Sequence, residues 1–450
     1  MGEKGKYYVA VIGAATSGSV AAELLADKGI HVAVIEQNNR PYGKIEDGLP
    51  RWHAQQRKQE YGLIDARLKK PGVRFVPGTK VGREIDFHNF CNQWGFSAVI
   101  LANGAWRDRD LGVPGTDRFI EKGLLYQNPF IYWYNHKNEK SYTGPRYETP
   151  DGTVVVGGGL ASIDVVKILQ LENYERALGA RGIHVDMHEL EKKGIPAVCK
   201  ANGIDPQSLG VQGCLLIYRR REQDMPLAQP PDNATPDQIA KTEQVRLKLL
   251  RLARDKFLFR VQDCTMVAGA LEENRRMVGL RVVRTKVDGR KAEPIPGSEL
   301  ELRAPLVISS IGSVPEVLPG VAMKGEYYIF SSEDIPRYTG CERVFGVGNV
   351  VTGQGNIRVS LVHSQKVTTH LIENYLDVGS SDGDLTPFYE AAEQKAAVQT
   401  ESMIEKILQL PSLSSEQIAA IEARVRDRQR ELGYTDYDSW IAKVTPPDLE

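Results

Sequence analysis

The sequence has few cysteines, and none of them is clustered. Its 450 residues contain five: Cys91, Cys199, Cys214, Cys264 and Cys341. No two form a CxxC or CxxxxC pair, so a redox-active dithiol is not expected, and the clustered thiolates of an iron–sulfur centre are also missing. We interpret each cysteine as a small buried hydrophobic residue.

The chain also has almost no net charge and no long apolar run. A formal net charge of −1 at pH 7 argues against general nucleic-acid binding. No apolar run approaches the length of a membrane span, and the apolar stretch at residues 7–12 is typical of a strand rather than a signal peptide. Met1 and Gly2 lack the Ser or Thr of a myristoylation site. We therefore expect a cytoplasmic protein. Its 450 residues exceed a single core, which predicts two or three domains.

A glycine-rich turn follows the first predicted strand. Residues 13–18 read GAATSG, and residues 20–28 have the pattern of a helix that ends at Gly29. Such a turn directs backbone N–H groups and the positive end of the helix dipole at a pyrophosphate. The next predicted strand ends at Glu36, whose carboxylate would accept hydrogen bonds from an unphosphorylated adenosine ribose, as in FAD or NAD. Ala15 replaces the middle glycine of the usual pattern.

A second turn of the same kind lies in the middle of the chain. Residues 157–162 read GGGLAS, after a predicted strand at 153–156 and before an apolar-periodic helix. The strand predicted at 214–218 ends in three arginines, the first two being Arg219 and Arg220, instead of an acid. Their guanidinium groups would pair with a 2′-phosphate, which favours NADP(H) over NAD(H). The alternative is a solvated charge run.

Two dinucleotide turns on one chain indicate a flavoprotein, and the wider pattern resembles a known family. Over about residues 6–375 the chain is similar to adrenodoxin reductase, its bacterial ferredoxin-NADP reductase relatives and the flavin subunit of NADPH-dependent glutamate synthase. The resemblance includes PYGKI through Gly48 to His53, YRR followed by DMPLA at 218–228, VISSIG at 307–312 and VFGVGNVVTG at 344–353. It implies an α/β fold of two interleaved Rossmann-like dinucleotide-binding domains, the glutathione-reductase type, with a C-terminal helical extension.

The domain order implied by this resemblance is interleaved. Residues 1–115 would form the first half of the FAD-binding domain and residues 326–379 its second half, with a helix from about Ile357 whose N-terminus faces the flavin. Between them, residues 116–325 would form the NAD(P)-binding domain. Within the NAD(P)-binding domain, an insertion is predicted at about 172–213 and antiparallel strands at 263–270, 278–285 and 299–302. A helical extension is predicted at 380–450.

Two helices are predicted in the extension. One covers about residues 387–409, and the other begins with a capping box formed by Ser414 and Gln417 and ends at Gly433. The extension could hold a partner subunit or wrap the flavin domain, and the second is the default interpretation.

The resemblance also implies a set of FAD ligands. They are Gly13, Ala15, Ser17, Gly18, Glu36, Gln37, Gly43, Lys44, Ala102, Gly104, Gly348, Asn349, Gly355, Asn356 and Ile357. Two positions depart from the usual pattern: Asn349 stands where many such flavoproteins have an Asp, and Asn103 replaces a small hydroxyl residue.

Ligands for NADP(H) and two candidate catalytic residues follow in the same way. The NADP(H) ligands are Gly157, Gly159, Leu160, Ala161, Arg219 and Arg220. His53 and Asp164 match positions that lie close together near the flavin in adrenodoxin reductase, so the carboxylate could orient the imidazole. The alternative is that both are only structural. No metal site is expected, because His184 and His188 have no further ligands beside them.

The implied reaction is hydride transfer between NADP(H) and FAD, followed by one-electron steps to a ferredoxin-like iron–sulfur protein or subunit. A predicted helix with basic residues could steer such an acidic partner, or could simply be solvated. Those residues are Lys241, Arg246, Lys248, Arg251, Arg254, Lys256 and Arg260. Three alternatives stay open: an NAD(H)-linked flavin subunit of a larger redox complex, a direct quinone or oxygen reductase, and a nucleotide-binding scaffold without activity.

Overall fold

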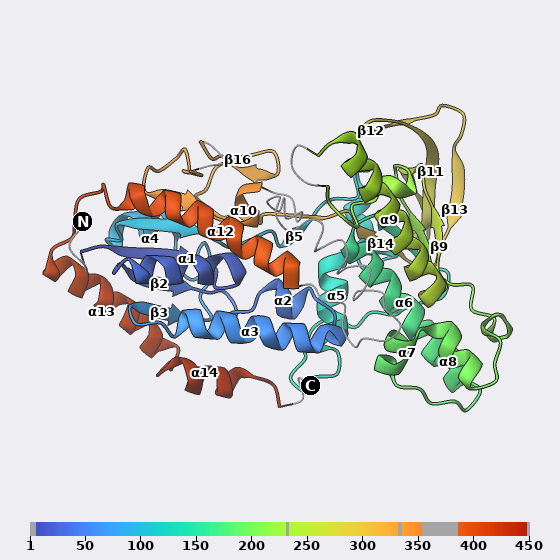
Figure 1. The fold of residues 1–450 in the computed structure, drawn as a ribbon, viewed down its shortest axis with the longest axis horizontal. Coiled ribbons are helices and arrows are strands. Elements are labelled where there is room, and N and C mark those ends of the chain that lie inside the picture. The colour runs from blue at the N-terminus through green and yellow to red at the C-terminus, as the bar shows by residue number, and fades with distance from the viewer. Residues whose placement is uncertain (1–5, 231–233, 332–334, 353–385, 448–450) are drawn as a thin grey trace.

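The protein has two lobes, each built on a five-stranded parallel sheet (Figure 1). A computed structural model describes residues 6–230, 234–331, 335–352 and 386–447. We call the lobe that contains the N-terminal strand the first domain and the other lobe the second domain. None of the described helices is both long enough and apolar enough to cross a bilayer.

The sheet of the first domain has its two faces buried in two separate cores. Val9 and Val11 of β1 point into one core, while Tyr8 and Ala10 point into the other, as the two-residue period of a strand requires. The strand order is β18 (Val344–Gly346), β4 (Ala98–Leu101), β1 (Tyr8–Ile12), β2 (His31–Ile35) and β3 (Val73–Val76). All neighbours are parallel.

The sheet of the second domain follows the same design. Val155 faces the core beneath the helices, and Val154 faces the core beneath the antiparallel strands. The strand order is β6 (Leu124–Tyr126), β14 (Val307–Ser310), β7 (Val154–Gly157), β8 (Leu215–Ile217) and β9 (Arg260–Gln262). The helices with side chains in the first of these cores include α5 (Gln127–His136), α6 (Leu160–Gly179) and α9 (Pro236–Phe257).

The chain leaves the first domain and returns to it through a pair of short antiparallel strands. β5 (Arg107–Asp108) pairs with β15 (Ser313–Val314), and the returning chain then adds β18 to the edge of the first sheet. This crossing confirms the predicted interleaved α/β fold. It also brings residues from distant parts of the sequence to the junction between the domains (Figure 1).

The predicted antiparallel strands are present, with one strand more than expected. They are β10 (Thr265–Glu273), β11 (Arg276–Asp288), β12 (Lys291–Pro294) and β13 (Leu300–Arg303). The remaining short elements are α2 (Lys44–Asp47), η1 (Arg51–His53), α3 (Ala54–Leu68), α4 (Phe87–Gln93), η2 (Thr116–Phe119), η4 (Glu222–Asp224), β16 (Met323–Lys324), β17 (Tyr327–Tyr328) and α10 (Asn349–Thr352).

The expected insertion begins later than predicted. Residues 172–179 continue α6, because their apolar side chains, Tyr174 and Leu178 among them, keep the helical period and stay buried. The segment after α6 folds into α7 (Met187–Lys193), α8 (Ile195–Ala201) and η3 (Pro206–Leu209). In the described part of the chain, no three His, Cys, Asp or Glu residues are grouped to hold a metal ion.

The C-terminal helices lie against the first domain. They are α12 (Thr386–Ile407), α13 (Ser415–Glu431), which has the predicted capping box at Ser414, and α14 (Tyr437–Val444). α12 runs along α1 (Thr16–Asp27) (Figure 1). Trp440 Nε1 donates to the carbonyl oxygen of Asn39 at 2.8 Å, and the Tyr437 hydroxyl donates to Asp65 at 2.7 Å. The extension therefore wraps the first domain, which is the arrangement predicted by default.

Candidate active site between two dinucleotide turns

The first turn joins β1 to α1 with very little space between neighbouring backbones. Gly13 has φ +102°, and a Cβ built there would lie 2.6 Å from the carbonyl oxygen of Ala102. Ala15 is the N-cap of α1, and neither a capping side chain nor an acidic residue occupies the first turn of this helix. The uncapped N–H groups and the positive helix end are therefore available to a pyrophosphate.

Glu36 ends the neighbouring strand and is buried beside this turn. Its carboxylate accepts hydrogen bonds from the backbone N–H groups of Ala14 and Asn38, both at 2.9 Å. Burial raises the pKa of Glu36 to about 7, against the effect of these two hydrogen bonds. The carboxylate is thus held in the position that an adenosine ribose would require.

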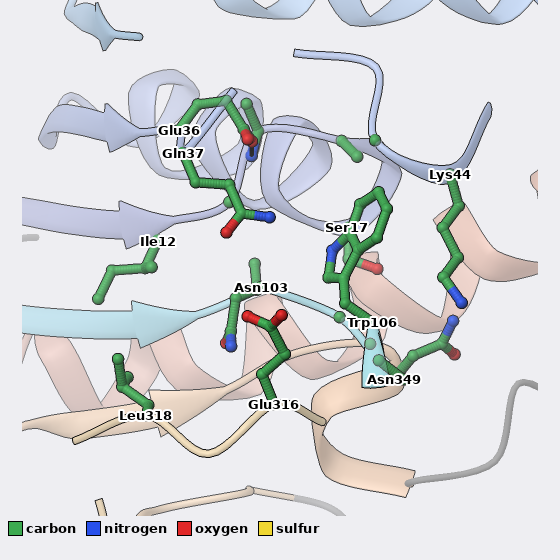
Figure 2. Close-up of a pocket in the computed structure, with 18 of the residues that line it drawn as sticks. Ile12, Ser17, Glu36, Gln37, Lys44, Asn103, Trp106, Glu316, Leu318 and Asn349 are labelled. Carbon is green, nitrogen blue, oxygen red and sulfur yellow. Dashed lines mark hydrogen bonds between the residues drawn. The ribbon is translucent and has the colours of Figure 1, made fainter. Parts of the chain in front are cut away.

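These groups line one elongated cavity in the first domain (Figure 2). Glu36 and Gln37 lie at one end, Ser17 lies in the middle, and Lys44 and Asn349 lie at the other end. The predicted FAD ligands that line it are Gly13, Ala15, Ser17, Glu36, Gln37, Gly43, Lys44, Ala102, Gly104, Gly348 and Asn349.

Four predicted FAD ligands are not among the lining residues. Gly18 packs behind the turn, where a Cβ would lie 1.9 Å from the carbonyl oxygen of Gly13. Gly355, Asn356 and Ile357, together with the helix expected from Ile357, lie outside the described residues.

The structure explains how the turn tolerates Ala15. A Cβ built on Gly43, which has φ +54°, would lie 2.8 Å from the Cβ of Ala15. The methyl group of Ala15 therefore points at a position where a second methyl group could not fit. The glycine missing from the first turn is compensated by a glycine in the segment that crosses it.

The second turn has the same form, at the end of β7. The Ser162 hydroxyl donates to the carbonyl oxygen of Ser310 at 2.9 Å and ties α6 to the neighbouring strand. A Cβ on Gly157 would lie 2.2 Å from that same carbonyl oxygen, whereas a Cβ on Gly159 would meet nothing within 4 Å. Gly159 is also an N-cap without a side-chain hydrogen bond. Open space at an uncapped helix N-terminus, beside Leu160 and Ala161, suits a second pyrophosphate.

The two arginines predicted to bind the 2′-phosphate lie in different environments. Arg219 is exposed, and its guanidinium has no hydrogen-bond partner among the residues that the structure describes. Arg220 donates to the Tyr218 hydroxyl and to the carbonyl oxygen of Asp224, both at 3.0 Å. Arg221 pairs with the carboxylate of Asp224. Of the three, Arg219 is the one available to a ligand.

His53 and Asp164 are both buried close to the junction between the domains. Burial, together with the nearby Lys167 ammonium, lowers the pKa of His53 to about 3, so its imidazole is neutral at pH 7. Lys167, one turn after Asp164 on α6, forms an ion pair of 2.8 Å with Glu191 of α7. Sequence reasoning missed both of these residues, because Glu191 belongs to the segment that was interpreted as an insertion.

Some residues that line the cavity were also missed. Trp106 directly follows the glycine turn at 102–105, so that motif could have indicated it. Lys80 and Glu316 form an ion pair of 2.6 Å on the cavity wall but come from separate segments with no recognisable motif. Asn103 donates to the Tyr328 hydroxyl at 3.1 Å, which gives the amide at this position a structural partner.

The residues present fit an FAD molecule. The turn backbones leave no room for a Cβ at Gly13 or Gly18, and the N-terminus of α1 is uncapped. The buried carboxylate of Glu36 lies at the end expected to bind adenosine. Gly348, at φ +75°, lies against the Ser17 side chain, so α10 also approaches the cavity closely.

Comparisons with known proteins find pyridine-nucleotide oxidoreductases among the proteins this chain resembles. Residues 7–194 match the family described as pyridine nucleotide-disulphide oxidoreductase. The NADPH-ferredoxin reductase FprA of Mycobacterium leprae is 26% identical over 402 residues, which cover 82% of this chain and 84% of that protein. The mitochondrial NADPH:adrenodoxin oxidoreductase of Arabidopsis thaliana is 27% identical over 164 residues, 36% of this chain and 33% of that protein.

A solved structure has the same fold. FprA of Mycobacterium tuberculosis, in complex with NADPH, superimposes with a TM-score of 0.66 at 19% identity, covering 94% of this chain and 91% of that one. The chain spans about a third of the length of the first curated relatives it matches. By its matched residues and by its fold, the chain resembles the class of pyridine nucleotide-disulphide oxidoreductases. Within this class, the predicted resemblance to adrenodoxin and ferredoxin-NADP reductases is confirmed.

Glu36→Gln is expected to remove a pH dependence of FAD binding. Ribose hydroxyls donate to a carboxylate, so FAD favours the ionised form of Glu36, whose pKa is raised to about 7 by burial. As the pH rises towards 7, the affinity of the wild-type protein for FAD should therefore increase by up to about tenfold per pH unit. Above pH 7 it should level off. Fluorescence titration of the apoprotein with FAD measures this. A wild-type affinity that does not change between about pH 5.5 and about pH 8.5 would contradict the assignment.

The same carboxyl group should affect the stability of the apoprotein in the opposite direction. Its pKa is higher in the folded chain than the ordinary value of 4.5. Between these two values the native state keeps a proton that the unfolded state has lost, so this contribution to stability falls as the pH rises.

Proposed function

We propose that the protein is an FAD-dependent NADPH oxidoreductase that passes electrons to a ferredoxin-like iron–sulfur protein or subunit. The observation that carries this proposal is the pairing of two dinucleotide turns on one chain with an exposed arginine, Arg219, at the strand end beside the second turn. The names of the relatives, which are NADPH-dependent reductases of ferredoxin or adrenodoxin, support the same function.

The residues of this chain would mainly position the two cofactors. Bound FAD supplies the conversion between a two-electron hydride donor and a one-electron acceptor. The turn at Gly13 would hold the FAD pyrophosphate and the turn at Gly159 that of NADPH. Each NADPH oxidised would give one hydride and reduce two one-electron acceptors, with release of one proton. None of the described cavity-lining residues is a cysteine, so disulphide exchange has no group to use there.

An acidic partner has a smaller basic surface available than the sequence indicates. Arg246 on α9 turns inward and donates to the carbonyl oxygens of Ala228 and Gln223. Arg254 pairs with Glu222 at 3.2 Å. The exposed basic residues of this group are Lys241, Lys248, Arg251 and Arg260.

Arg219→Ala is expected to reduce the preference for NADPH over NADH. Loss of a charge-assisted contact to the 2′-phosphate costs about 1.5–3 kcal/mol, or roughly 10- to 150-fold in kcat/KM for NADPH, while kcat/KM for NADH stays unchanged. Steady-state reduction of a chemical electron acceptor with each nucleotide measures the two values. Arg221→Ala is the matched control, because that guanidinium is already occupied by Asp224. Equal losses for both nucleotides in R219A would contradict the assignment.

The proposed electron acceptor is tested by turnover with a purified [2Fe–2S] ferredoxin under anaerobic conditions. NADPH oxidation that depends on ferredoxin is the expected result. Rapid turnover with dioxygen or a quinone, and none with ferredoxin, would replace the proposal with a direct reductase. Turnover only after addition of companion subunits would indicate a component of a larger complex.

A further inference from the structure

Lys44 lies at the end of the cavity that is farther from Glu36. It is the first residue of α2 and lines the cavity together with Trp106 and Asn349 (Figure 2). If the adenosine ribose lies at Glu36 and the pyrophosphate at the turn beside Ser17, the far end receives the flavin ring. A lysine side chain therefore extends into the flavin end of the site.

Three side chains near the junction between the domains contact the Lys44 ammonium. It donates to Asn128 Oδ1 on α5 at 3.1 Å and to the Ser313 hydroxyl on β15 at 3.0 Å. It also lies 5.7 Å from the centre of the Trp106 ring. An ammonium has three N–H donors. With two of them used on the protein side, one remains for the cavity.

A carboxylate that does not line the cavity, Asp108, acts on this lysine. Asp108 on β5 accepts from the backbone N–H of Asn128 with both oxygens, at 3.2 and 3.3 Å, and is not among the lining residues. Burial lowers the pKa of Lys44 to about 8, and Asp108 limits this decrease. At pH 7 the lysine thus remains mostly a cation, and the carboxylate that acts on it does not line the cavity.

The opposite end of the cavity provides a comparison. Lys80 also lines the wall, but it pairs directly with Glu316 at 2.6 Å. It follows the end of β3, next to the strand that carries Glu36, and so belongs to the adenosine end. Lys44 and Lys80 thus lie at different ends of the cavity, whose described lining also includes Lys395 of α12.

We propose that Lys44 is a positioning residue whose ammonium stabilises the reduced, anionic flavin relative to the oxidised flavin. A hydride carries two electrons and one proton from NADPH, which leaves as NADP⁺, so the neutral ring gains one negative charge. An ammonium fixed in a largely enclosed site offsets that charge without having to reorganise. Asn349, which lines the same end of the cavity, is an amide and brings no negative charge to this lysine. The proposal rests on the proposed function only in that the cavity holds FAD.

The test is the midpoint potential of bound FAD, measured with a chemical reductant and reference dyes and without NADPH. In K44M the reduced flavin should bind about tenfold more weakly relative to the oxidised flavin, which lowers the two-electron midpoint potential by about 30 mV. K44R keeps the charge and should change this ratio less than about threefold. K80M, the matched control, removes a positive charge at the adenosine end and should leave the potential unchanged.

Each outcome decides the proposal. A K44M protein that binds FAD and keeps the wild-type potential overturns it, and so does a K80M protein with an equal decrease. If K44M fails to bind FAD, K44Q, which keeps a donor towards Asn128 without a charge, replaces it in the same measurement.

The failure of the inference can be distinguished from the failure of the proposed function. Wild-type protein that binds FAD but is not reduced by NADPH disproves the function, while the potential of its flavin still tests Lys44. Wild-type protein that binds no FAD at all disproves both.

Discussion

Gly18→Ala is expected to abolish the retention of FAD. A Cβ at this position would lie 1.9 Å from the carbonyl oxygen of Gly13 and 3.3 Å from the Cβ of Ala102. The nearest obstacle is backbone, so the β1–α1 turn must open and its N–H groups lose their alignment with the pyrophosphate. We expect FAD affinity at least about 100-fold lower, equivalent to about 2.7 kcal/mol. The ratio of FAD to protein after gel filtration and a fluorescence titration measure the loss.

Gly62→Ala is the matched control for this substitution. Gly62 lies in α3 of the same domain, is exposed, and a Cβ there would meet nothing within 4 Å. This variant should keep its FAD and gain roughly 0.5–1 kcal/mol of stability from the better helix propensity of alanine. G18A protein that elutes with the wild-type ratio of FAD to protein would show that the turn does not bind the pyrophosphate.

Lys167→Met is expected to destabilise the fold by about 2–3 kcal/mol, because it removes the hydrogen-bonded cation of the half-buried Glu191 and leaves only the more weakly acting Lys256 near it. The Lys167 side chain is 1% exposed and that of Glu191 is 16% exposed. The Lys167 ammonium also lies 4.5 Å from the centre of the Trp52 ring. Urea unfolding of the wild-type and variant proteins measures the difference in the free energy of unfolding.

Lys167→Met should also shift the pKa values of the neighbouring Glu191 and His53. Burial would raise the pKa of Glu191, but the ammonium groups of Lys167 and Lys256 hold it below its usual value, and only the contribution of Lys256 remains in the variant. The pKa of His53 should rise from about 3, since Lys167 reinforces the effect of burial there. An NMR titration of His53 detects this change, which a purely steric defect would not cause.

A double variant separates charge from packing. K167M/E191L replaces the ion pair with two apolar side chains and should recover most of the stability lost in K167M. A loss below about 1 kcal/mol in K167M, or no recovery in the double variant, would contradict the assignment of this ion pair as the cause.

Local sequence patterns predicted the parts of the site that depend on neighbouring residues. The strand, glycine turn and helix around Gly13 are contiguous, and so are those around Gly157, so their geometry follows from steric rules along one segment. Glu36 follows in the same way from its position at the end of β2. The interleaved order of the two domains was implied by the family resemblance rather than by any local pattern.

The contacts between distant segments could not be predicted in this way. Asp108, Asn128 and Ser313 converge on Lys44 only because β5 and β15 cross between the domains and α5 begins beside them. Each of these residues is unexceptional in its own stretch of sequence. The environment of Lys44 therefore depends on tertiary packing that no local pattern encodes.

The arginines after β8 show the same limit on a smaller scale. In sequence, Arg219 and Arg220 are equivalent members of one charge run. In the fold, the hydroxyl of Tyr218 and the carbonyl oxygen of Asp224 lie within reach of Arg220 alone, so it becomes a structural residue. Only the first arginine remains available, and this difference is what the Arg219 and Arg221 variants measure.

The function proposed for this chain is hydride transfer from NADPH at the Gly159 turn to FAD at the Gly13 turn. The most direct test is anaerobic rapid mixing of the FAD-loaded protein with NADPH or with NADH, following the flavin absorbance. We expect fast bleaching by NADPH, at least about tenfold slower bleaching by NADH, and recovery of the absorbance when oxidised ferredoxin is added. Bleaching by NADH alone, or none with either nucleotide, would contradict it.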